Sequence, residues 1–483
     1  MKTRPARQPG LRAGRPSLTK GRKRDHRAYS FWLDDTPGEL LPRPALEGPT
    51  DVDVVIVGAG YTGLWTAYYL ARADPHLRIA VIEKDVAGFG ASGRNGGWVS
   101  PSFATPLTKL AESHGREAAI RMQRTMFDTV DEIGRVCVAE SIDAQYHKGG
   151  SLWVSTSPAQ TPRVKAVLKG QQAFGFGDAD WVWMGRREVL HRVRVEGCLG
   201  GIFSARYASV QPARLVRGLA QVVDRMGVRI YEGTPALSAA PGGVDTPAGR
   251  ISADAVILAT EAYTGQLPGH GRDVVPIHEY MIATAPLPVS FWEEVGWAGR
   301  EVLSDGRHLI IYAQRTADDR IAIGGTEGMY HFGSRIAERF ERRRATFQRL
   351  ETALKLLFPA FSGAGITHRW GGVFGATRDW HTCVDFDPSN GFGWAGGYVG
   401  DGVATANLAG RTLSDLILRR ESDLTGLPWV HHRSKPWERE PLRWIGATGV
   451  RVVMSRADEA EFGKGREVRW SPLLTKIEEI VGW

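Results

Sequence analysis

The sequence predicts an α/β protein that combines a Rossmann-type, mostly parallel sheet with a second, α+β region built on an antiparallel sheet. A hydrophobic run, 52–57, precedes glycines in G-x-G-x-x-G spacing and an apolar helical pattern, which is typical of a Rossmann βαβ unit. Two later stretches, 250–264 and 391–418, again place small residues after a buried strand. Between them lie shorter strand-like pieces, such as SLWVST and RIAIGGTEG, which suit an antiparallel sheet. Because 483 residues exceed the size at which one core stops growing, we expect at least two cores.

The net charge of +8 is concentrated at the N-terminus. Residues 1–27 hold ten Lys or Arg and one acid, so the rest of the chain is nearly neutral. Because this stretch is rich in Arg, Pro and Gly, residues 1–30 are predicted to be a disordered basic tail. A solvated extension, or a start codon assigned too early, is favoured over a tether to nucleic acid or an anionic membrane. The tail lacks the apolar core of a secretory signal.

Cysteine and histidine usage argues against metal chemistry. Cys137, Cys198 and Cys383 stand far apart with no C-x-x-C pair, and the thirteen histidines include no H-E-x-x-H motif. We therefore expect no metal site and no disulfide framework, and a reducing, cytoplasmic location.

The uncharged stretch 54–71 is long enough to raise the question of a membrane span. It divides into strand, glycine turn and helix, so no span is predicted.

The first βαβ unit has the parts that bind a dinucleotide. Gly58 permits the tight turn, Gly60 lets the backbone approach a pyrophosphate, and Gly63 lets the helix pack on the strand. The helix expected over 61–72 would direct its free N–H groups and positive dipole end at the phosphates. These parts, with strands on both sides of the helix, make the glycine pattern a strong signal.

A carboxylate marks the end of the second strand of this unit. Strand 78–82 is followed by Glu83, twenty residues after Gly63, where it can accept hydrogen bonds from both ribose hydroxyls. A carboxylate there would repel a 2′-phosphate. NADP is therefore disfavoured, and NAD and FAD both remain.

A second cluster of small residues favours a flavin nucleotide. In GFGASGRNGG, 88–97, six of ten residues are glycine or alanine, although glycine loses more entropy on folding than any other residue. A plain NAD domain has no need of such a cluster, whereas a flavin ring and its pyrophosphate need close backbone approach from a second direction. Ser92, Arg94 and Asn95 can donate hydrogen bonds there, and the glycines leave room for a planar ring.

With these motifs the sequence resembles the FAD-dependent amine and amino-acid oxidoreductases of the D-amino acid oxidase superfamily. Within it, the chain is most similar to γ-glutamylputrescine oxidase-like members, many of which carry ASGRNGG nearly as written here. The likeness covers about residues 30–425 and implies a noncovalent FAD. It places the strand of 250–264 back in the flavin domain, and it brings backbone N–H groups of 391–418 to the flavin pyrimidine. A helix N-terminus there would stabilise negative charge on the reduced ring.

The resemblance also implies an adenine contact near 234–236, after a helix over 212–226 and a strand over 228–231. The residues expected to contact the cofactor are Gly58, Gly60, Tyr61, Thr62, Gly63, Glu83, Lys84, Ala91, Ser92, Arg94, Asn95, Gly96, Gly97, Thr234, Pro235, Ala259, Thr260, Gly400, Asp401, Gly402 and Val403.

The predicted FAD-binding domain comprises residues 31–145, 205–265 and 371–425. The predicted substrate domain comprises 146–204 and 266–370. It includes a helix over 334–358, whose charge run 339–349 should be a solvated face. Residues 426–483 form a C-terminal extension that wraps either the body or an interface, with Trp429, Trp437 and Trp444 among prolines and charges.

The resemblance implies oxidation of a CH–NH bond. In the family a C–H beside an amine nitrogen gives hydride to flavin N5, and the resulting imine hydrolyses. Amino-acid-oxidising relatives such as glycine oxidase clamp the substrate carboxylate with an arginine in the strand that matches WGGVFGATRD, where this chain has Phe374. An amine, for example a polyamine derivative, is therefore favoured over an α-amino acid.

The same position holds the flavin-linking cysteine of sarcosine oxidases, so Phe374 also predicts noncovalent FAD. The lysine that promotes oxygen reaction in sarcosine oxidases falls at Ala322, which leaves O2 or another electron acceptor open. The residues predicted to form the catalytic wall are Tyr280, Tyr312, Trp370, Phe374 and Tyr398, where aromatic rings could enclose an ammonium. Arg315 is a further candidate, as a partner for an acidic substrate group.

Three alternatives stay open on the sequence. The first is an amino-acid oxidase or dehydrogenase of the same superfamily, and the second is an NAD-dependent dehydrogenase. The third is a flavin-bearing subunit that serves a partner through the basic tail. The amine, the electron acceptor and the oligomeric state are not indicated.

Overall fold

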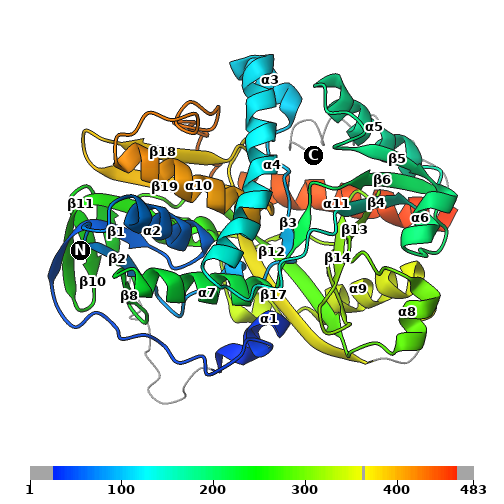
Figure 1. Ribbon diagram of the computed structural model, residues 1–483, viewed down its shortest axis with the longest axis horizontal. Coiled ribbons are helices and arrows are strands. Elements are labelled where there is room, and N and C mark those ends of the chain that lie inside the picture. The colour runs from blue at the N-terminus through cyan, green and yellow to red at the C-terminus, as the bar shows by residue number, and fades with distance from the viewer. Residues whose placement is uncertain (1–24, 362–364, 465–483) are drawn as a thin grey trace, which may run out of the picture.

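The computed structural model describes residues 25–361 and 365–464 and contains two large sheets (Figure 1). The first, with α2 and α10, lies at the left of Figure 1, and the second, with α6 and α8, lies at the right. Residues 1–24 of the predicted tail and 465–483 of the predicted C-terminal extension lie outside the described residues. None of the helices in the described part of the chain combines the length and the apolar composition of a membrane span.

The first sheet is mostly parallel and has the order β18-β19-β11-β1-β2-β8. These strands are Cys383–Asp387, Phe392–Gly396, Gly249–Leu258, Thr50–Val57, Ile79–Ile82 and Arg229–Tyr231, in that order. Strand β1 pairs in parallel with β11 and β2, β2 with β8, and β11 with β19, while β18 is antiparallel to β19. Two further antiparallel strands, β10 (Gly243–Thr246) and β9 (Ser238–Ala240), extend from β11. The predicted α/β fold class is confirmed.

Helices α2 (Tyr61–Ala73), α7 (Pro212–Arg225) and α10 (Gly402–Ile417) lie beside the first sheet. Helices α2 and α10 pack on each other, and α2 also contacts α7. Buried apolar side chains of α2, such as Leu64 and Leu70, join the largest hydrophobic core. Helix α4 (Arg116–Ala139) packs on α10 and α3 (Leu107–His114).

The second sheet is mostly antiparallel, in the order β16-β12-β15-β14-β13-β4-β6-β5, with β17 paired to β12. These strands are Met329–Tyr330, Val275–Thr284, Ile321–Gly325, Ile311–Arg315, Val302–Asp305, Ser151–Ser155, Gly200–Ser204 and Val182–Gly185, with β17 at Ile366–Ala376. The pairing of β13 with β4 is parallel. The associated helices are α5 (Gln160–Ala173), α6 (Arg186–Arg192), α8 (Val289–Val295) and α9 (Arg344–Leu357). A two-stranded ladder joins β3 (Trp98–Val99) to β7 (Ala208–Ser209).

Strand β17 crosses the predicted domain boundary at residue 371. Its residues pair with β12 from Val275 to Thr284, so residues 371–376 belong to the second sheet. Placing them in the FAD-binding domain was therefore wrong for this strand. The rest of the division into domains stays a prediction.

The helix expected over 334–358 is wrong in its first half. Only α9 is a full helix, preceded by a short 3₁₀ turn, η4 (Glu338–Phe340). Two contacts hold this turn in place. The Tyr280 hydroxyl donates to the Phe340 carbonyl at 2.7 Å, and Glu341 forms a buried ion pair with Arg94 at 2.8 Å. The charge run 339–349 is thus only partly a solvated face.

The N-terminal segment 25–40 packs on the body, so disorder was the wrong prediction for residues 25–30. It contains η1 (His26–Tyr29) and α1 (Phe31–Asp34). His26 contacts Asp85 at 2.7 Å, and the buried Ser30 donates to the Gly93 carbonyl at 2.8 Å. These contacts tie the segment to the loop 83–97.

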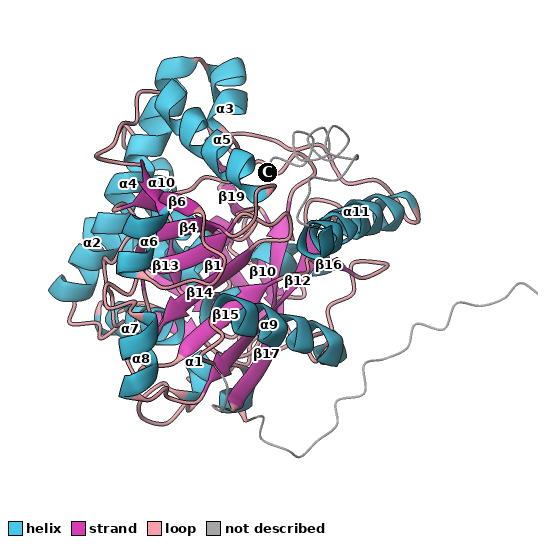
Figure 2. Cartoon of the chain, turned by 90° about the vertical axis from the view of Figure 1, so that its right-hand side faces the viewer, coloured by secondary structure: helices cyan, strands magenta, loops and turns pink. Residues whose placement is uncertain are grey.

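The C-terminal extension wraps the body over its described residues. Trp429 is fully buried, and the Trp437 indole donates to the Ala376 carbonyl at 2.8 Å, whereas Trp444 is exposed. Helix α11 (Leu442–Lys464) packs on β16, as Figure 2 shows from the side. Glu461 of this helix pairs with Arg163 of α5 at 2.8 Å.

Candidate active site

A cavity of about 1300 Å³ is lined by residues of both sheets. Small-molecule pockets are typically about 300–1,000 Å³, so this cavity is large enough for an extended ligand. It begins at the carboxyl ends of β1 and β2, where open parallel sheets bind their ligands. It continues past the loop 88–97 to strands β12, β14 and β17 of the second sheet.

The glycine turn after β1 has the predicted geometry. Gly58 has φ +111°, and a Cβ there would lie 2.6 Å from the Ala259 carbonyl oxygen. A Cβ on Gly63 would lie 2.0 Å from the Gly58 carbonyl oxygen, so Gly63 serves helix packing and does not line the cavity. Gly60, Tyr61 and Thr62 line it at the start of α2.

Glu83 lies at the carboxyl end of β2, as expected. Its carboxylate accepts hydrogen bonds from the backbone N–H of Ala59 at 3.0 Å and of Asp85 at 2.9 Å. Burial raises the pKa of Glu83 to about 7. Thr234 and Pro235 line the cavity beside it, and the Thr234 N–H donates to the Glu83 carbonyl at 2.8 Å. Lys84 lines the same end and is exposed.

The side chains expected to donate from the loop 88–97 are engaged within the protein. The Ser92 hydroxyl accepts from the Tyr61 N–H at 2.9 Å, and Asn95 donates to the Ala91 carbonyl at 3.1 Å and accepts from the Gly97 N–H at 2.7 Å. Arg94 donates to Glu341. These side chains therefore shape the loop, and the ligand-facing surface is largely backbone.

Contacts from outside the loop hold it in position. The Trp32 indole donates to the Asn95 carbonyl at 2.7 Å, and the Trp370 indole donates to the Arg94 carbonyl at 2.8 Å. Gly97 has φ +71°, and a Cβ there would lie 2.4 Å from the Val210 carbonyl oxygen. Gly97 thus serves the turn and does not line the cavity, whereas Ala91 and Gly96 do line it.

The third backbone segment of the cavity runs from β19 into α10. Gly400, Asp401, Gly402 and Val403 all line the cavity, as expected, together with Ala259 and Thr260 after β11. Asp401 is the N-cap residue of α10. Burial raises its pKa to about 7, against a hydrogen bond with Ser100 that lowers it.

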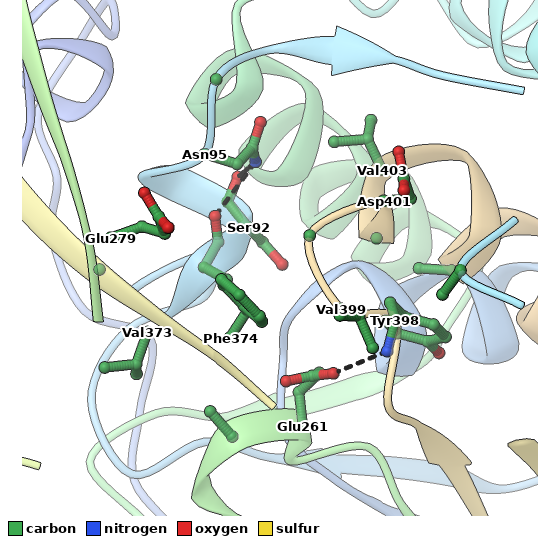
Figure 3. Close-up of a pocket in the computed structure, with 18 of the residues that line it drawn as sticks. Ser92, Asn95, Glu261, Glu279, Val373, Phe374, Tyr398, Val399, Asp401 and Val403 are labelled. Carbon is green, nitrogen blue, oxygen red and sulfur yellow. Dashed lines mark hydrogen bonds between the residues drawn. The ribbon is translucent and has the colours of Figure 1, made fainter. Parts of the chain in front are cut away.

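Glu261 connects the ends of three strands and was missed by the sequence analysis. Its carboxylate accepts from the backbone N–H of Gly375 and of Gly397 at 3.1 Å. It also accepts from the backbone N–H of Tyr398 at 3.2 Å (Figure 3). Burial raises its pKa to about 7, although these hydrogen bonds oppose the shift. Its position directly after a buried strand that ends in small residues is the sequence signal that could have found it.

Four of the five predicted wall residues line the cavity: Tyr312, Trp370, Phe374 and Tyr398. Tyr280 does not, and this prediction was wrong. Tyr280 is paired with Gly371, whereas its neighbour Glu279 is paired with Gly372. Successive side chains of a strand point to opposite faces, so Glu279 faces the cavity and Tyr280 is buried on the other side.

Arg315 is also outside the cavity. Its guanidinium pairs with Asp319 at 2.6 Å and lies 4.0 Å from the Trp292 ring centroid. A role for Arg315 in binding an acidic substrate group is therefore excluded in this conformation. Ala322, at the position expected for the oxygen-activating lysine, is buried in β15.

The site has the donors and acceptors that a flavin dinucleotide requires. The first N–H groups of α2 have no intrahelical acceptor, and those beyond the Tyr61 N–H, which donates to Ser92, suit a pyrophosphate. Glu83 offers a carboxylate at the ribose position, and the backbone of 399–403 lies at the start of a helix. A bound FAD would supply the two-electron chemistry, and the chain would supply position and electrostatics.

Comparisons with known proteins agree with this geometry. Over 403 residues the chain is 29% identical to the "Probable oxidoreductase OrdL" of Rhizobium meliloti (strain 1021), covering 81% of this chain and 89% of that protein. It is 28% identical over 393 residues to the "Gamma-glutamylputrescine oxidoreductase" of Escherichia coli (strain K12), covering 80% and 88%. The solved structure of glycine oxidase from Geobacillus kaustophilus matches with a TM-score of 0.63 at 22% identity, covering 79% of this chain and 99% of that one.

Residues 53–416 match the family model "DAO: FAD dependent oxidoreductase". This match covers the βαβ unit, the loop 88–97, both sheets and most of α10. An NAD-dependent dehydrogenase is therefore not favoured. The chain belongs to the DAO family of FAD-dependent oxidoreductases.

Proposed function

We propose that this protein oxidises the CH–NH bond of an amine that carries no carboxylate on the reacting carbon, using noncovalently bound FAD. The observation that carries the proposal is the composition of the cavity wall formed by β12 and β17. The residues of these two strands that line the cavity are Glu279, Met281, Trp370, Gly372, Val373 and Phe374, and none of them is cationic.

A substrate carboxylate would have no cationic partner on this wall. Arginine is the natural bidentate partner of a carboxylate, and Phe374 offers only apolar contact. Arg94, the cation of the adjoining loop, is held by Glu341 at 2.8 Å through Nη1 and by the Phe89 carbonyl through Nε, and only its buried Nη2 has no partner among the described residues. Burying a carboxylate against this wall would therefore cost its hydration without a compensating ion pair from β12 or β17. An amine with an alkyl chain is better matched, because the aromatic residues Tyr312, Trp370 and Phe374 line the cavity and offer it apolar contact.

The cysteines support noncovalent binding. Cys137, Cys198 and Cys383 are buried, and none of them lines the described cavity. No thiol is thus positioned to bond the flavin.

Two measurements test the proposal. Acid precipitation of the yellow protein should release all of its flavin into the supernatant as FAD, and flavin retained in the pellet would contradict noncovalent binding. Anaerobic mixing with a panel of primary amines and α-amino acids should bleach the flavin with amines. Bleaching by α-amino acids alone would overturn the amine assignment.

A further inference from the structure

We infer that Glu279 binds a second, non-reacting ammonium group, so that the substrate is a diamine or a longer polyamine. This inference rests on the proposed function and specifies its substrate class. It comes from one feature of the cavity, an acidic side chain that no described cation pairs with and one of whose carboxylate oxygens has no hydrogen-bond partner.

Glu279 lies on the wall formed by β12 and β17, where it is paired with Gly372 and shares its face of the sheet with Phe374 (Figure 3). Asp401 and Val403 lie across the cavity in the same view. The Glu279 Oε2 atom is fully buried and has no hydrogen-bond partner among the described residues. No described Arg, Lys or His pairs with its carboxylate, which receives a backbone hydrogen bond from Tyr280.

Other acidic residues that line the cavity are satisfied by the protein. Glu83 and Glu261 accept hydrogen bonds from backbone N–H groups, and Glu341 pairs with Arg94. Asp305 pairs with Arg307 at 2.6 Å. Glu279 is different, because an unpaired buried carboxylate is costly and a buried group of this kind calls for a partner from outside the chain.

Burial and the nearby Glu327 raise the pKa of Glu279 well above its usual value. A cation placed against the carboxylate would reverse this effect, because opposite charge favours the ionised form. Tyr312 lines the cavity near this carboxylate, and its ring can add a favourable contact with an ammonium group.

The cation at Glu279 is best assigned to a nitrogen that does not react. Hydride leaves the carbon only as the lone pair of the neighbouring nitrogen forms the C=N bond, so the reacting nitrogen must be neutral. A positively charged nitrogen at Glu279 is therefore a different one. A diamine satisfies both requirements, with an ammonium at Glu279 and a neutral amine at the reacting position.

The test compares 1,4-diaminobutane with butylamine, which has the same chain length and lacks the second nitrogen. Anaerobic reduction of the holoenzyme flavin at a series of amine concentrations gives Kd and the limiting reduction rate for each amine. The wild-type protein should bind the diamine at least about tenfold more tightly, since a charge-assisted hydrogen bond is worth about 1.5–3 kcal/mol. Equal affinities would overturn the inference without requiring any variant.

Glu279→Gln should raise Kd for the diamine about 10- to 100-fold and leave Kd for butylamine nearly unchanged. The limiting reduction rate should change little, because Glu279 holds the remote end of the substrate. Glu351→Gln is the control, since this carboxylate of α9 pairs with Lys355 at 2.9 Å, does not line the cavity and should leave both constants unchanged. An equal loss of both amines in Glu279→Gln would contradict the inference.

The two proposals fail differently. Butylamine and 1,4-diaminobutane could reduce the flavin equally well, with Glu279→Gln changing Kd for neither amine. In that case the proposal of amine oxidation is supported and only the role of Glu279 is contradicted. If no amine reduces the flavin, both fall. Diamine affinity of the wild-type protein should also weaken more steeply than butylamine affinity as pH decreases, because protonation of Glu279 removes the charge that binds the second ammonium, and Glu279→Gln should remove this difference between the two amines.

Discussion

The two halves of the cavity are built in different ways. One half is lined by the ends of β1, β2 and β11 and by the loop 88–97, and we call it the nucleotide half. There, polar side chains such as Glu83, Asn95 and Glu261 accept hydrogen bonds from backbone N–H groups of the protein itself. In the substrate half, the wall of β12 and β17 is mostly apolar, and its one carboxylate, Glu279, has a buried oxygen without a partner. The hydrogen bonds of the nucleotide half fix the position of the backbone that lines it, which we call the backbone cradle. In the substrate half, the free oxygen of Glu279 can bind a group of the ligand.

The Arg94–Glu341 ion pair joins the two halves and gives the largest expected effect. Arg94→Met would leave Glu341 buried and unpaired, so we expect a loss of about 3–5 kcal/mol in the free energy of unfolding. Urea unfolding of the holoenzyme measures it. The double variant Arg94→Met/Glu341→Met should recover most of the loss, and a double variant as unstable as the single one would show that the pair is not the cause.

The backbone cradle is tested at Gly58. Gly58→Ala places a Cβ 2.6 Å from the Ala259 carbonyl oxygen at φ +111°, so it should cost about 3 kcal/mol and reduce the flavin content of the purified protein. Gly48→Ala is the matched control, because a Cβ there meets nothing within 4 Å. Wild-type flavin content in Gly58→Ala would contradict the assigned cradle.

Asp401, at the start of α10, should show a pH signature. Because burial raises its pKa from 3.8 to about 7, the folded state holds this proton more strongly than the unfolded state. The stability that Asp401 contributes is therefore present below about pH 4 and is lost as pH rises toward 7. Protein freed of flavin should become less stable than its Asp401→Asn variant over this interval. Urea unfolding at pH 4.5 and 7.5 measures the difference, and a constant difference would refute the shift.

The smallest effects are expected for the tyrosines on opposite faces of the second sheet. Tyr280→Phe removes a hydrogen bond to the Phe340 carbonyl and should cost about 1 kcal/mol in stability without changing amine affinity. Tyr312→Phe changes a cavity residue and should alter amine affinity with little loss of stability. Thermal unfolding and anaerobic reduction separate the two, and a reversed pattern would show that the faces are wrongly assigned.

The same contrast explains what the sequence could predict. Short contiguous motifs specify the nucleotide half: three glycines after one strand, Glu83 after the next, and the small-residue loop. The substrate half depends on the pairing of β12 with β17, which lie about 90 residues apart in the chain. Which of Glu279 and Tyr280 faces the cavity depends on that register, because a shift of one residue would exchange their faces. The sequence therefore indicated aromatic residues in this region but not the orientation of Tyr280.

Long-range contacts also account for the other errors. Residues 25–30 look like part of a basic tail, yet His26 and Ser30 find partners at Asp85 and Gly93. Residues 334–343 look helical, but Glu341 and the Phe340 carbonyl are held by Arg94 and Tyr280. In each case a tertiary partner outweighs local preference.

The most direct test of the central claim is anaerobic reduction of the bound flavin by 1,4-diaminobutane, butylamine and norvaline, which is butylamine with a carboxylate on the reacting carbon. A wall without a cation and with Glu279 predicts that the diamine reduces the flavin most efficiently, butylamine less so and norvaline least. Faster reduction by norvaline than by either amine would contradict it.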